Sequence, residues 1–170
     1  MRDDKIQKLV WAGLFTALTT VATIAIPIPS PTGGYVHAGD ALVILSAFLL
    51  GPAWGAVAAG LGSALADIFT HHIVFAPVTL IIKALMALSA GAILRRAKNK
   101  SSIKSAVLGS VIAELIMVAG YFAFEAVFLG LGWGAIAGVL PNCIQAVFGA
   151  VAGTALFYAL LRIPYVKKTF

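Results

Sequence analysis

The sequence predicts an all-helical integral membrane protein, a bundle of six transmembrane helices with both termini in the cytoplasm. Of its 170 residues, 61% are hydrophobic and only 11% are charged, whereas a soluble domain is about 45–50% apolar and about 25% charged. A helix needs about 20 residues to cross a bilayer, which leaves room for about six or seven crossings. We therefore expect a single transmembrane domain over residues 1–170, without a built-in ATPase, receptor ectodomain or soluble catalytic unit.

The distribution of positive charge predicts the topology. Eleven of the 12 Lys and Arg residues lie in three clusters at the ends of apolar runs. With six crossings, all three clusters fall on one side of the membrane, which the positive-inside tendency identifies as the cytoplasm. The net charge of +6 therefore reflects topology, and we expect no nucleic-acid partner. The clusters are Arg2, Lys5 and Lys8; Arg95, Arg96, Lys98, Lys100 and Lys104; and Arg162, Lys167 and Lys168.

The first apolar run, Leu9–Ile26, ends at a proline-rich segment. A signal peptide has a shorter core of about 7–15 residues, so we expect a retained helix. A loop follows at residues 28–39. The next apolar stretch, Ala41–Ile68, is interrupted at Gly51-Pro52, a strong turn signal. This pattern is consistent with two short helices or with one kinked helix, and the charge distribution favours two.

Three further apolar runs complete the six helices. They lie at Pro77–Leu94, Lys104–Leu129 and Ala135–Leu161. In this topology the loops at 28–39, 70–76 and 130–134 are external.

Polar side chains within these runs indicate an outward-facing pocket. An ionisable group at membrane depth costs at least about 2.5–3.5 kcal/mol and usually faces a cavity or a partner. On the fifth helix, Glu114, Tyr121 and Glu125 are spaced so that they share one face. The expected substrate-binding residues are Tyr35, His37, Asp67, Thr79, Lys83, Glu114, Tyr121, Glu125, Asn142 and Gln145.

Structural roles are open for several polar residues. Asp40 has the position of an N-cap for the second helix. Lys83 either contacts a ligand directly or pairs with Glu114 or Glu125 between helices. The adjacent His71 and His72 point in different directions on a helix, which is poor geometry for a shared metal. We expect no metal site, no cofactor and, with a single cysteine, no internal disulfide.

Small side chains on the first helix predict a docking face. Such residues let helix backbones approach closely in lipid. The face serves either an external partner or the protein's own packing. It consists of Ala12, Gly13, Thr16, Ala17 and Thr20.

Taken together, these features resemble the substrate-binding S components of energy-coupling factor (ECF) vitamin transporters. The likeness covers essentially the full chain and includes the short helices, the basic N-terminus and the Gly/Pro-rich first loop. The segment from Gly51-Pro52-Ala53-Trp54-Gly55 to Asp67 is similar to that family's second-to-third helix region, and Pro141-Asn142-x-x-Gln145 is similar to the motif that opens its sixth helix. One departure is that Gly13 and Thr16 stand in the docking face, where the family usually has alanines.

The resemblance implies a multi-pass protein of a prokaryotic plasma membrane that binds a vitamin with high affinity beneath its first loop. It implies as partners a membrane T component and two cytoplasmic ATPases, and it implies no enzymatic activity for this chain. A phosphate-binding loop is indeed missing from the sequence. Among the family's branches, the chain looks closest to those for hydroxymethylpyrimidine or pyridoxine, which are small heteroaromatic alcohols. Riboflavin, folate or cobalamin would need a larger cavity.

Two other classes of function remain open from the residues alone. One is a self-sufficient secondary transporter or channel that uses Glu114, Lys83 or Glu125 as a proton relay. Such transporters often contain inverted repeats, and no convincing repeat is present. The other is a membrane enzyme, for which the sequence offers no recognisable nucleophile–base pair or metal-ligand cluster.

Overall fold

The computed structural model describes residues 2–97, 99 and 102–169, with side chains from residue 5 to 166 of these ranges. Lys98 and Lys100 of the middle basic cluster lie outside the described residues, as do the side chains of Arg2, Lys167 and Lys168. The helices are α1 (Arg2–Ala25), α2 (Asp40–Leu50), α3 (Pro52–Phe69), α4 (Ala76–Arg96), α5 (Ile103–Val127), α6 (Ile136–Leu160) and α7 (Pro164–Thr169), with a short 3₁₀ turn at Gly132–Ala135 before α6.

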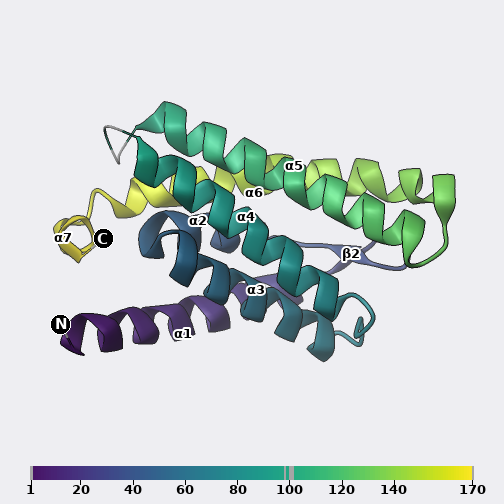
Figure 1. The fold of residues 1–170 in the computed structure, drawn as a ribbon, viewed down its shortest axis with the longest axis horizontal. Helices are drawn as coiled ribbons and strands as arrows, with labels where there is room; N and C mark the ends of the chain where they lie inside the picture. Colours follow the sequence, from purple (N-terminus) through teal and green to yellow (C-terminus); the bar gives the residue numbers. More distant parts are fainter. Residues whose placement is uncertain (1, 98, 100–101, 170) are drawn as a thin grey trace.

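The helices run roughly along one axis, with connections at both ends (Figure 1). Both termini, the end of α4 and the start of α5 lie at one end of the bundle. This end carries the described members of the three basic clusters, and we call it the basic end. The α3–α4 and α5–α6 connections lie at the opposite end, together with a hairpin of β1 (Ile28–Pro29) and β2 (Tyr35–Val36).

Membrane-spanning length is reached by five helices within the described residues: α1, α3, α4, α5 and α6 with its preceding turn. The expected division at Gly51-Pro52 is confirmed, because α2 ends at Leu50 and α3 begins at Pro52. However, α2 has 11 residues, about 16 Å at 1.5 Å per residue, and is therefore too short to cross a bilayer by itself. The count of six spans and the side of the termini stay predictions.

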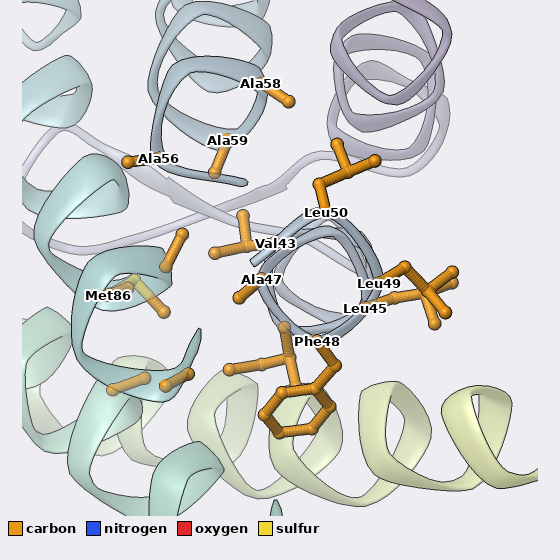
Figure 2. Packing of buried hydrophobic residues seen from close by; sticks show 14 of the residues in the cluster. Val43, Leu45, Ala47, Phe48, Leu49, Leu50, Ala56, Ala58, Ala59 and Met86 are labelled. Carbon is orange, nitrogen blue, oxygen red and sulfur yellow. The ribbon is translucent and has the colours of Figure 1, made fainter. Parts of the chain in front are cut away.

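Helix α2 is the centre of the bundle. Every residue of α2 except Leu42 is buried, as expected for a helix that is hydrophobic all round. Figure 2 looks along this helix and shows its apolar side chains pointing to several sides, with Phe48 directed toward α6 and Leu50 toward α1. Helix α2 contacts α1, α3, α4, α5 and α6, so its position sets that of the helices around it.

The sharp reversal between α2 and α3 depends on Gly51. Its φ of 80° and ψ of −179° belong to a region that is essentially restricted to glycine. The guanidinium of Arg95 occupies the space where a β-carbon would stand, and its Nη2 donates to the Leu50 carbonyl over 3.0 Å. The reversal is therefore tied to the last turn of α4.

The small-residue face of α1 is divided by the fold. Ala12 and Thr20 are buried, and the Thr20 hydroxyl donates to the Gly62 carbonyl of α3 over 2.8 Å. Thr16 is partly buried in the same contact, where a β-carbon on Gly62 would lie 2.7 Å from the Thr16 carbonyl oxygen. Ala17 and Gly13, by contrast, are exposed, and nothing lies within 4 Å of a β-carbon built on Gly13.

Candidate functional site

A polar cavity lies where the loop at residues 28–39 covers the helices near the end opposite the basic end. Its volume is about 20 Å³, which is close to the space of a single water molecule. Eight of the ten sequence-predicted substrate-binding residues line it. The full lining is Ser30, Gly34, Tyr35, His37, Asp67, Phe75, Thr79, Tyr121, Glu125, Asn142 and Gln145.

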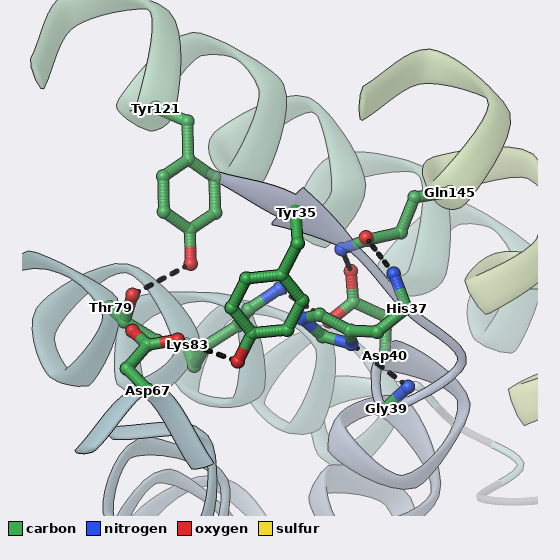
Figure 3. Close-up of polar contacts among 9 residues, drawn as sticks. All are labelled: Tyr35, His37, Gly39, Asp40, Asp67, Thr79, Lys83, Tyr121 and Gln145. Atoms are coloured by element: carbon green, nitrogen blue, oxygen red, sulfur yellow. Dashed lines mark hydrogen bonds and ion pairs between the residues drawn. The ribbon is translucent and has the colours of Figure 1, made fainter. Parts of the chain in front are cut away.

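The loop is held over this cavity by three hydrogen bonds, each to a different helix. The Tyr35 hydroxyl donates to Asp67 Oδ1 of α3 over 2.8 Å, and the Thr32 hydroxyl donates to Glu125 Oε1 of α5 over 2.9 Å. The His37 backbone N–H donates to Gln145 Oε1 of α6 over 2.7 Å. The loop therefore closes the cavity by direct contact with its walls. Figure 3 shows the contacts of Tyr35 with Asp67 and of His37 with Gln145.

The remaining two predicted site residues lie deeper than the cavity. Lys83 is completely buried and pairs with Asp40, the first residue of α2. Gln145 connects this pair to the loop, because its Nε2 donates to Asp40 Oδ2 over 2.6 Å. Glu114 lies close to Asp40, since a β-carbon on Gly149 would contact both side chains.

These contacts correct two sequence-based expectations. Asp40 does not cap α2, because Gly39 holds the N-cap position and no side-chain cap bond is formed there. Its carboxylate instead accepts from Lys83 and Gln145. Lys83 accordingly pairs with Asp40 and with neither Glu114 nor Glu125. The reason is that the loop carries the start of α2 into the bundle, where Asp40 meets Lys83 of α4.

Aromatic rings form the upper part of the site. The Tyr35 ring lies with its centroid 4.5 Å from that of His72 and 5.3 Å from that of His37. The Tyr121 hydroxyl shares a 3.0 Å hydrogen bond with Thr79, and Lys83 Nζ lies 5.5 Å from the Tyr121 ring centroid. The site thus combines aromatic rings with a few polar side chains, as small-molecule pockets commonly do.

The loop residues have protonation states that match these contacts. Burial, followed by the charge of Lys83, lowers the pKa of His37 to about 4, and His37 Nδ1 accepts the Gly39 N–H over 3.0 Å as a neutral ring requires. Burial also raises the pKa of Tyr35 above its ordinary value. The Tyr35 hydroxyl therefore keeps its proton and serves as a donor to Asp67.

Sequence reasoning missed part of this site. Thr32 and Ser30 are ordinary loop residues in the sequence, and Phe75 is one apolar residue among many. Asp40 had been assigned a capping role. No local pattern distinguishes the first three, whereas the charge of Asp40 inside an apolar region was a signal for a partner across the bundle.

Within the described residues, no three His, Cys, Asp or Glu side chains are placed to hold a metal ion. His71 has a positive φ of 62° and forms part of the turn after α3. His72 Nδ1 lies 3.1 Å from the Thr70 hydroxyl. These two histidines therefore serve the turn and the aromatic contact with Tyr35.

Loss of the Lys83 ammonium group should destabilise the protein strongly. Lys83→Met leaves the Asp40 carboxylate buried and uncompensated, and we expect the free energy of unfolding to fall by about 3–5 kcal/mol. The double variant Asp40→Leu/Lys83→Met leaves no charge behind and should recover most of this loss. Denaturant unfolding in detergent micelles measures both. A single variant no less stable than the double variant would contradict a structural role for the pair.

Acid should loosen the loop through His37. Its pKa in the folded protein, about 4, is below the unfolded value of about 6.5, so the unfolded state binds more protons between these pH values. The stabilisation is complete above about pH 6.5 and decreases as the pH falls toward 4, with an expected loss of about 1–2 kcal/mol because the ring is only partly buried.

The measurement is the unfolding midpoint at pH 7 and pH 4.5, in the wild type and in His37→Gln. The groups that face His37, namely Lys83, Asp40 and the Tyr35 ring, are kept in the variant and supply the common background. A smaller decrease in the variant is expected, and equal decreases would remove His37 as the cause.

Comparisons with known proteins agree with this architecture. The sequence model of the family described as "ECF-type riboflavin transporter, S component" matches residues 3–162. A protein of Pyrococcus woesei, described as "Uncharacterized protein in gap 3'region", is 37% identical over 144 residues, which are 84% of this chain and 94% of that protein.

A solved structure described as the S component of a bacterial ECF transporter has the same fold. It superposes with a TM-score of 0.73 over 93% of this chain and 97% of that chain, at 24% sequence identity. The family match confirms the resemblance found in the sequence at the level of the family. Because the family match extends over nearly the whole chain, this multi-pass membrane protein belongs to the ECF-type riboflavin transporter S components.

Proposed function

We propose that this protein is the high-affinity capture subunit of an ATP-driven ECF importer for a small water-soluble vitamin. The observation that carries the proposal is the polar cavity beneath the loop at residues 28–39, enclosed by α3, α4, α5 and α6 within an otherwise apolar bundle. Membership of the family supports the same role. The protein hydrolyses nothing itself and delivers its ligand through a membrane T component and two cytoplasmic ATPases.

The proposed orientation places the basic end in the cytoplasm of a prokaryotic cell. Charge supports this, because Lys5, Lys8, Arg95 and Arg96 lie toward the end where both termini emerge (Figure 1). The cavity and its covering loop then face outward, where the vitamin is encountered. In this arrangement α2 runs from the loop toward the basic end, and α3 runs back from the reversal at Gly51 to the outer end. The expected six-helix topology has the same order of directions.

Two ligand types are supported by different observations. Riboflavin is named in the description of the matching family. Hydroxymethylpyrimidine and pyridoxine are smaller heteroaromatic alcohols, and the small closed cavity of about 20 Å³ favours them. Any of these exceeds the closed volume, so binding requires the loop with Tyr35 and His37 to move outward first. Riboflavin is our first candidate, because the family match extends over 160 residues.

Native mass spectrometry of the purified protein, followed by titration with riboflavin, hydroxymethylpyrimidine and pyridoxine, tests this proposal. We expect one of them to bind tightly, and Asn142→Ala to weaken that binding by about 10–100-fold, because a buried polar group of the ligand loses its partner. Binding of none of the three would overturn the proposal. So would proton-driven uptake into liposomes that contain this chain alone, which would identify a secondary transporter.

The docking face for the T component is proposed to centre on Gly13 and Ala17 of α1. Both are exposed, whereas Thr16 and Thr20 contact Gly62 of α3 and Ala12 is buried. Lipid gives helices little hydrophobic incentive to associate, so close backbone approach must supply the attraction. Gly13 and Ala17 are small beside the exposed Leu14 and Leu18, and nothing lies within 4 Å of a β-carbon built on Gly13, so a partner helix has room to approach.

Bulky side chains at this position should separate binding from transport. We expect Gly13→Leu and Ala17→Trp to keep ligand affinity in detergent while abolishing pull-down of the T component and ATP-dependent uptake. Ala155→Trp, at an exposed alanine of α6, is the matched control and should retain both. Loss of ligand binding along with transport in the α1 variants would show that these residues serve internal packing instead.

A further inference from the structure

Two carboxyl groups connect the covering loop to the cavity. Asp67 of α3 and Glu125 of α5 both line the cavity and are almost fully buried, with 4% and 3% of their surfaces exposed. Each accepts one hydrogen bond from the loop, Asp67 from the Tyr35 hydroxyl and Glu125 from the Thr32 hydroxyl. Each carboxyl thus uses one oxygen to hold the loop in place.

The second oxygen of each carboxyl is left without a partner. Among the described residues, neither Asp67 Oδ2 nor Glu125 Oε2 accepts a hydrogen bond, although both atoms are buried. The Thr79 hydroxyl shares a hydrogen bond with the Tyr121 hydroxyl and also lies beside the Asp67 carboxyl, so Glu125 Oε2 is the more isolated of the two acceptors. Buried acceptors in folded proteins are nearly always paired, and an unpaired one is unfavourable. The site therefore contains two acceptor atoms on different helices that a molecule in the cavity could satisfy.

The charge balance around the cavity limits what that molecule can be. No Lys or Arg is among the residues that line the described cavity. The ammonium group of Lys83 lies below it and is already paired with Asp40. His37 is neutral in the folded protein, because burial lowers its pKa to about 4. The N–H or O–H donors of a ligand can bond to the free carboxyl oxygens. An anionic group would be buried beside the carboxyls without a counter-ion, which is unfavourable.

We propose that Asp67 and Glu125 determine ligand specificity, each accepting a hydrogen bond from the loop with one oxygen and from a donor group of the ligand with the other. The site then accepts neutral or cationic vitamins that carry such donors and rejects their phosphate esters. The inference rests on the proposed function and adds the ligand class that this particular site selects.

The arrangement also couples ligand binding to loop closure. Each carboxyl has both oxygens satisfied only when the loop is closed and the ligand is present. A ligand that engages the free oxygens therefore favours the closed loop, and the closed loop in turn strengthens ligand binding. Removing a loop bond should change how long any ligand stays bound, and removing the carboxylate should change which ligand is preferred.

The experiment compares three alcohols with their phosphate esters on the purified full-length protein. The pairs are riboflavin and flavin mononucleotide, pyridoxine and pyridoxine 5′-phosphate, and hydroxymethylpyrimidine and its monophosphate. For the pair that binds, we expect the wild type to prefer the alcohol by at least about 100-fold, the scale of an uncompensated buried charge.

The variants separate the two sides of each carboxyl. Glu125→Gln and Asp67→Asn keep the shape but remove the charge, and each should reduce the preference for the alcohol by about tenfold or more. Thr32→Val is the matched control, because Thr32 holds the loop to Glu125 without lining the cavity. It should speed dissociation of alcohol and ester by a similar factor and leave the preference unchanged.

The outcomes distinguish this inference from the proposed function. Binding of an alcohol and its ester with equal affinity, or an unchanged preference in both carboxyl variants, overturns the inference and leaves vitamin capture intact. Failure of the wild type to bind any of the six probes overturns the proposed function and the inference together. Thermal unfolding of each variant in detergent identifies any that fail to fold. Thr32→Val then still tests the coupling between ligand binding and loop closure.

Discussion

The buried ion pair between Asp40 and Lys83 is the constraint on which the rest of the site depends. A lone charge at this depth is strongly unfavourable, so each group requires the other. The pair joins the start of α2 to the middle of α4, and Gln145 of α6 extends it to the backbone of His37 in the loop. Four separate parts of the chain are thereby placed relative to one another, and the floor of the cavity follows from that placement.

The same pair decides the electrostatic character of the cavity. Of the six acidic residues in the chain, four belong to the apolar region, and Lys83 is the basic residue outside the three clusters. Among the described residues, Lys83 forms its ion pair with Asp40 and not with Asp67 or Glu125. These two carboxyls instead accept hydrogen bonds from hydroxyl groups of the loop. Asp40 and Lys83 therefore have a structural role, whereas Asp67 and Glu125 line the cavity in which a ligand would bind beneath the loop.

The membrane-facing surface follows a simpler rule. Helix α1 packs against α3 where Gly62 lets the backbones approach, and it turns large apolar residues such as Leu9 and Val10 outward. A small-residue pattern in the sequence contains both the packed and the outward positions, because residues three and four apart on a helix are neighbours. Only the packing partner separates Gly13 and Ala17 from Ala12 and Thr20, and this partner lies about 40 residues away in the chain.

The sequence by itself determined the membrane class, the approximate position of each helix, the break at Gly51 and most of the residues that line the cavity. These features depend on local composition and on polar side chains within apolar runs. Both can be recognised in the sequence without knowledge of the tertiary contacts. Only the tertiary structure decided that Asp40 pairs with Lys83 and that Thr32 and Tyr35 close the loop on Glu125 and Asp67. These contacts join residues 32 to 93 positions apart, and their geometry depends on how deeply the loop descends among the helices, which no local pattern encodes.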